Sequence, residues 1–159
     1  MIHIDIVCVG KLKETYLKDA IWEYSKRLSK YCQLQIIELP DEKVPTTLNA
    51  SIIKDIKQKE STQILEHIKK DSYIIALDLK GKSYTSEQFS EKLTFIPLTH
   101  SRITFIIGGT LGMTEDLLSV CNESICFSKM TFPHQLIRIF LLEQLFRGFK
   151  IANHETYHH

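Results

Sequence analysis

A glycine-rich stretch follows one of the most apolar segments of the chain. Gly108, Gly109 and Gly112 come directly after the run RITFII at 102–107. Glycine permits positive φ and lets a backbone approach a bound molecule closely. A tight turn before a helix would explain the same glycines, so alone they leave ligand binding open.

The two common nucleotide-binding patterns are not fulfilled. Gly-Lys-Ser at 81–83 has the form of the end of a phosphate-binding loop, but Ala76 occupies the position of that loop's first glycine. The glycines at 108–112 do not match the dinucleotide pattern G-x-G-x-x-G. A nucleotide-dependent oxidoreductase is therefore disfavoured.

The segment FSKMTFPHQ at 127–135 carries apolar residues where an exposed loop is expected. Phe127, Met130 and Phe132 either fold back into the core or line a pocket for a flat apolar group. His134 follows in the first turn of the last predicted helix. A helix N-terminus disfavours a charged imidazole and favours anionic ligands, although a histidine there is more often a cap or surface residue than a catalyst.

The last predicted helix is apolar on two faces and is interrupted by Arg138, Glu143 and Arg147. Charges in such a helix must be paired or must face a ligand, and ion pairing is the expected explanation. Two apolar faces predict two partners, the sheet and something else. A second subunit would satisfy this requirement, and a symmetric dimer is the commonest solution.

A metal site is not predicted. The cysteines at 8, 32, 121 and 126 are scattered, and the lone C-x4-C has no companion ligands, so we expect reduced thiols. His154 and His158 are spaced i,i+4, but the sequence offers no third ligand near them.

Strand and helix signals alternate along the chain. Strands are predicted at 2–9, 33–39, 73–79, 102–107 and 124–127, and helices at 13–30, 48–69, 85–93, after Thr114 and at 133–152, with a turn at Gly81. This order predicts an α/β fold, a mostly parallel sheet flanked by helices. Ligands of such sheets bind at the carboxyl ends of strands, here in the loops 78–82, 108–113 and 128–133.

Composition predicts one domain spanning 1–159, with 43% hydrophobic residues and a net charge of +1. An apolar run of about 18 residues and a signal-peptide layout are both missing, so a cytoplasmic protein without membrane contact is expected. The balanced charge disfavours binding of DNA or RNA by bulk electrostatics, and the lysine-rich face of 48–69 is interpreted as solvated surface.

Five motifs together resemble one bacterial family. They are ELPDEK at 38–43, LDLKGK at 77–82, IGG-x-x-G at 107–112, FSKMTFPHQ at 127–135 and R-x4-E-Q-x-x-R at 138–147. The whole chain is similar to the ribosomal large-subunit methyltransferase H family, within the SPOUT class of knotted methyltransferases. The resemblance implies a SPOUT-type α/β-knot whose C-terminal half forms a trefoil knot.

The resemblance also implies the reaction. S-adenosylmethionine would donate a methyl group to N3 of a pseudouridine in helix 69 of 23S rRNA, position 1915 in rRNA numbering. A homodimer would act on the assembled 70S ribosome, without a metal. The donor would be bound by residues matching the family's positions, namely Leu77, Gly108, Phe127, Ser128, Lys129, Met130, Thr131 and Phe132.

His134, Arg147 and Tyr157 match family positions suspected of catalysis, with Arg147 or Tyr157 orienting the base and His134 near the RNA. Where relatives are expected to end in a basic residue, this chain has His159. That difference predicts activity that falls as the pH rises through the histidine range. Two alternatives stay open, a non-catalytic ribosome-associated RNA-binding factor and a methyltransferase of another RNA, such as tRNA.

Overall fold

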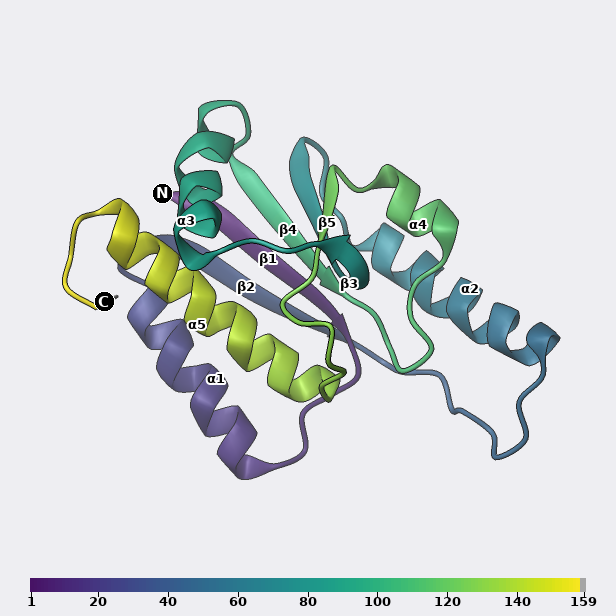
Figure 1. Cartoon of the computed structure of the whole chain (residues 1–159). Helices are drawn as coiled ribbons and strands as arrows, with labels where there is room; N and C mark the ends of the chain where they lie inside the picture. Colours follow the sequence, from purple (N-terminus) through teal and green to yellow (C-terminus); the bar gives the residue numbers. More distant parts are fainter. Residues whose placement is uncertain (158–159) are drawn as a thin grey trace.

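The computed structural model describes residues 1–157 and has five strands alternating with helices (Figure 1). All strands are parallel, in the order β2-β1-β4-β3-β5, which confirms the predicted α/β class. The elements are β1 (Ile2–Val9), α1 (Thr15–Leu28), β2 (Cys32–Leu39), α2 (Ala50–Glu66), β3 (Ser72–Lys82), α3 (Ser86–Phe95), a 3-10 turn (Ile96–Leu98), β4 (Arg102–Ile107), α4 (Glu115–Val120), β5 (Glu123–Ile125) and α5 (His134–Ala152).

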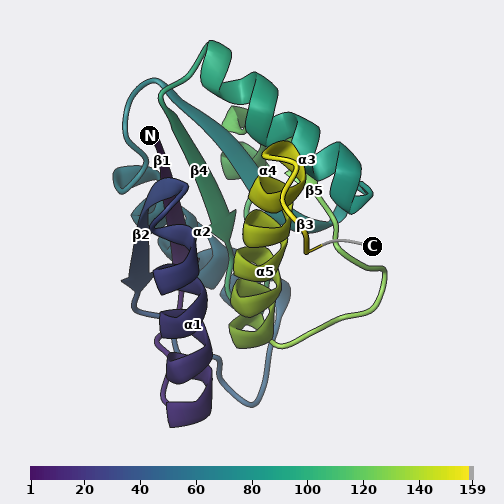
Figure 2. The ribbon, with the colours of Figure 1, turned by 90° about the vertical axis from the view of Figure 1, so that its left-hand side faces the viewer.

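Helices cover both faces of the sheet. Helices α1, α5 and α3 form one layer, and α2 and α4 lie on the opposite side (Figures 1 and 2). Strands β1 and β4 are buried on both faces because they are apolar almost throughout, as expected for the centre of a parallel sheet. None of the described helices is long and apolar enough to cross a membrane.

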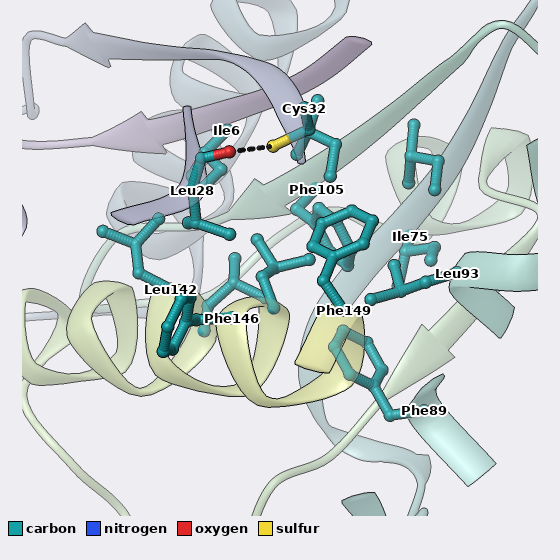
Figure 3. Close-up of a cluster of buried hydrophobic side chains, with 14 of the residues drawn as sticks. Ile6, Leu28, Cys32, Ile75, Phe89, Leu93, Phe105, Leu142, Phe146 and Phe149 are labelled. Atoms are coloured by element: carbon teal, nitrogen blue, oxygen red, sulfur yellow. Dashed lines mark hydrogen bonds between the residues drawn. The ribbon is translucent and has the colours of Figure 1, made fainter. Parts of the chain in front are cut away.

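The main core lies beneath the layer of α1, α5 and α3. Leu142, Phe146 and Phe149 of α5 meet Phe105 of the sheet and Leu93 of α3 there (Figure 3). Gly148 lets α3 approach closely, since a Cβ at that position would lie 2.7 Å from Leu93 Cδ1. The core thus fixes α5 across the sheet.

Both apolar faces of α5 are largely covered within one chain. Leu141, Leu142 and Leu145 have no exposed surface, because α1 and α3 flank the helix on either side. The predicted second partner of α5 is therefore supplied by α1 and α3 of the same chain. Phe140 remains partly exposed, and the homodimer itself stays a prediction.

The turn predicted at Gly81 is also wrong, because β3 continues to Lys82. Ile125 of β5 pairs with Leu77 and again with Lys82, so residues 78–81 of β3 form an irregular, bulge-like part of the strand between these two pairings. A Cβ at Gly81 would lie 2.6 Å from the backbone carbon of Ile125. Glycine is needed here for space. The trefoil knot stays a prediction.

Glu123 strengthens the pairing of β3 with β5. Its carboxylate accepts hydrogen bonds from Tyr73 (2.6 Å), Tyr84 (3.1 Å) and Lys92 (3.0 Å), which join β3, the segment after it and α3 to β5. Burial alone would raise the pKa of Glu123, but the three donors together lower it. A hydrogen-bond network around one charged carboxylate thus stabilises the pairing of β3 with β5.

We expect Gly81→Ala to destabilise the protein by at least about 3 kcal/mol, because the methyl group would press on backbone that cannot rotate away. Gly112→Ala is the matched control, since Gly112 has φ +87° but no atom within 4 Å of its Cβ position. Backbone strain alone should cost it about 1–2 kcal/mol. Urea unfolding measures both, and equal stability of the two variants would contradict a steric role for Gly81.

Candidate functional site

One cavity is lined by the second half of β3, the loops that follow β4 and β5, and the first turn of α5. Seven of the eight residues predicted to bind the donor line it, and the eighth, Lys129, is exposed and does not. The seven are Leu77, Gly108, Phe127, Ser128, Met130, Thr131 and Phe132. The structure therefore gathers residues from three separate segments around a single space, at the edge of the sheet where parallel folds bind ligands.

The glycine-rich loop after β4 forms one wall. Gly112 has φ +87°, and its N–H donates to the Gly109 carbonyl at 3.0 Å, which closes a tight turn. The amide of Thr114 donates to Ser61 Oγ at 3.1 Å, which ties the end of this loop to α2. The wall is formed mostly by backbone, so it can approach a ligand closely.

Glu60 of α2 supports this loop from behind, a role that the sequence analysis missed. Its side chain is buried, and Oε2 accepts the Glu42 amide at 3.0 Å. A Cβ at Gly109 would lie 2.5 Å from Glu60 Oε1, so a larger residue there would have to displace this carboxylate. Burial raises the pKa of Glu60. The available signal in the sequence was an acidic residue on the face of the amphipathic helix that packs against the protein.

The loop after β5 forms the opposite wall. The Cys126 thiol donates to the Ser128 carbonyl at 2.9 Å, and the Met130 amide donates to Ser128 Oγ at 3.0 Å. Phe127 both packs against the core and lines the cavity, so the two alternatives for these apolar residues apply together. Phe132 packs edge-on against Phe140, with ring centroids 5.4 Å apart.

His134 lines the cavity from the first turn of α5. Burial lowers its pKa, and the nearby positive charge of Arg138 lowers it further. Arg138 is itself buried and donates to Glu38 and to the Gly10 carbonyl, each at 2.6 Å. The predicted ion pairing of this arginine is confirmed, and it fixes the start of α5 to the ends of β1 and β2.

Arg147 and Tyr157 lie elsewhere. Arg147 pairs with Glu143 at 2.7 Å, the Tyr157 hydroxyl donates to the same carboxylate at 3.3 Å, and the guanidinium lies 4.8 Å from the Tyr157 ring centroid. Glu143 is thus the structural partner of an arginine, as predicted. Arg147 follows His134 by thirteen helical residues, about 20 Å along the axis, so one chain does not bring the three predicted catalytic residues together.

A metal ion would need several donor side chains close together. Within residues 1–157, no three His, Cys, Asp or Glu side chains are grouped in this way. His158, the second member of the i,i+4 histidine pair, and the terminal His159 lie outside the described residues.

The whole chain is similar to proteins of a known family. A family model described as predicted SPOUT methyltransferase matches residues 2–158. The chain belongs to this family. It is 58% identical to the ribosomal RNA large subunit methyltransferase H of Clostridium botulinum strain 657, over 98% of this chain and 99% of that protein. The corresponding protein of Clostridium acetobutylicum is 52% identical over the same shares.

A solved structure of a SPOUT-type protein shares the fold. The A. aeolicus TrmH/SpoU tRNA modifying enzyme aligns with a TM-score of 0.53 at 11% identity, covering 96% of this chain and 78% of that one. At this identity the similarity concerns the fold alone. The predicted SPOUT class is confirmed, and the chain is a methyltransferase of that class by family.

We expect the pKa of His134 to lie below the ordinary histidine value of about 6.5, because burial and Arg138 both disfavour the imidazolium. NMR titration of the imidazole C2–H, assigned by comparison with His134→Gln, measures it. The same imidazole in the urea-unfolded protein is the control, since unfolding removes both the burial and the fixed position of Arg138. A His134 pKa at or above about 6.5 in the folded protein would contradict the neutral imidazole.

Proposed function

We propose that the protein transfers a methyl group from S-adenosylmethionine to N3 of pseudouridine 1915 in helix 69 of 23S rRNA, acting as a homodimer on the 70S ribosome. The observation that carries this proposal is the gathering of the matched positions around one cavity in a chain of the SPOUT family. Relatives at 52–58% identity over nearly the whole chain carry the name rRNA large subunit methyltransferase H.

The residues present fit S-adenosylmethionine. Adenine needs apolar walls, which Leu77, Ile107 and Phe127 supply, and ribose and methionine need hydrogen bonds, which loop backbone and the hydroxyls of Ser128 and Thr131 can make. The glycines allow close approach of the backbone. The bound donor supplies an activated methyl group on a sulfonium, and the protein supplies position and electrostatics.

Transfer requires in-line approach of the acceptor nitrogen to the methyl carbon. The N–C bond forms as the C–S bond breaks, both electrons of that bond stay on sulfur, and the N3 proton leaves. Neutral His134 lines the cavity and can accept a proton at its free ring nitrogen. A cation beside the uracil carbonyls would stabilise the charge that develops as the proton leaves, a role suited to Arg147.

His134 and Arg147 cannot act on one acceptor from the same helix. They are about 20 Å apart along the axis and project from largely opposite sides, at about 100° per residue. A homodimer resolves this if the Arg147–Tyr157 end of one protomer faces the cavity of its partner. We therefore place Arg147 and Tyr157 in the partner's site, beside His134.

The substrate is tested with ribosomes from a strain lacking the orthologous enzyme. We expect incubation with the protein and S-adenosylmethionine to add one methyl group to helix 69, located by mass mapping, and to fail with free 23S rRNA. A methyl group on another RNA would support the alternative substrate, and donor-independent ribosome binding without transfer would support a non-catalytic factor. Either result would overturn the proposal.

The shared site is tested with mixed dimers. His134→Ala and Arg147→Ala should each reduce single-turnover methylation at least about a hundredfold. Random mixing of the two inactive variants should restore about a quarter of the wild-type sites, because half of the dimers then hold one intact site. Mixing that restores no activity, with dimers confirmed by mass, would show that both residues act within one chain.

A further inference from the structure

Asp78 lies in the cavity because of the irregular pairing of β3 with β5. It follows Leu77, the first residue that pairs with Ile125, and the chain returns to Ile125 at Lys82. Asp78 therefore lies in the irregular part of β3, between two residues that both pair with Ile125 of β5. The side chain is half-buried and lines the cavity.

The carboxylate of Asp78 has no cationic partner, in contrast to three acids that hold parts of the fold together. Asp5 pairs with Arg102 at 2.7 Å, Glu38 with Arg138 at 2.6 Å and Glu123 with Lys92 at 3.0 Å. Within residues 1–157, the side chain of Asp78 makes neither a hydrogen bond nor an ion pair. Its charge thus stabilises no contact of the fold.

Asp78 is also the one acidic residue among the described residues that line the cavity, and it is accompanied by a single histidine whose pKa is lowered. The rest of the lining is apolar or uncharged. A fixed negative charge in such surroundings favours a cation, and desolvation by a ligand strengthens that preference.

We propose that Asp78 determines specificity by holding the sulfonium of S-adenosylmethionine, which distinguishes the methyl donor from the neutral thioether S-adenosylhomocysteine. This inference rests on the proposed function. The sulfur lies between the two arms of the donor molecule, so binding of both arms would remove most of the water around it. A desolvated charge needs a counterion, and Asp78 is the charge that the cavity offers.

The same interaction promotes turnover. Methyl transfer leaves the sulfur with both electrons of the broken bond and without charge, so the attraction to Asp78 ends with the reaction. The product is then held by shape and hydrogen bonds alone, which favours its release relative to the donor.

Calorimetry on the full chain tests this with S-adenosylmethionine and S-adenosylhomocysteine. In Asp78→Asn, the ratio of the donor Kd to the product Kd should rise about tenfold over the wild-type ratio, because only the donor loses a charge interaction. Asp78→Glu keeps the charge and should retain most of the wild-type ratio. Asp19→Asn, at an exposed position of α1, is the control for net charge and should leave the ratio unchanged.

The outcomes separate this inference from the proposed function. Equal weakening of both ligands would mean that Asp78 contacts a group they share, such as the ammonium, and would overturn the sulfonium assignment while leaving the methyltransferase proposal intact. An unchanged ratio in folded Asp78→Asn, with folding checked by its melting temperature, would overturn it as well. A wild-type protein that binds neither ligand, alone or with ribosomes, would overturn both.

Discussion

The double pairing of Ile125 with β3 is the constraint on which the site depends. Leu77 and Lys82 are both register partners of this residue, so the part of β3 between them departs from regular pairing with β5. This irregular part of β3 and the loops after β4 and β5 together line the cavity. Gly81 permits the contact sterically, and the hydrogen bonds to Glu123 hold it.

A second set of interactions sets the position of α5 relative to that edge. Arg138 is buried and binds Glu38 and the Gly10 carbonyl, so the first turn of the helix is attached to the ends of β1 and β2. Such a buried charge is costly unless every partner is in place, which makes the arrangement specific. The consequence is chemical as well as structural, since the same guanidinium helps to keep His134 neutral.

The sequence predicts the repeating parts of the structure well and the long-range parts poorly. Strands β1 and β4 are recognisable because continuous apolar runs leave few alternatives, and Thr114 is recognisable as a cap because its hydroxyl bonds the Leu117 amide locally. The irregular pairing of β3 with β5 could not be predicted, because a glycine such as Gly81, judged only from its sequence neighbours, indicates a turn. Glu60 and Asp78 were missed for a related reason, since their roles depend on neighbours far along the chain.

The distribution of charge in the cavity follows the charge that the proposed reaction moves. In the proposed reaction, the positive charge would be on sulfur before transfer, where Asp78 would stabilise it, and afterwards sulfur would be neutral and His134 would hold the N3 proton. An imidazole that was already protonated could not accept it, so the lowered pKa of His134 and the carboxylate of Asp78 would serve the two ends of one displacement. The mostly apolar or uncharged remainder of the lining would screen both effects little once a ligand excludes water.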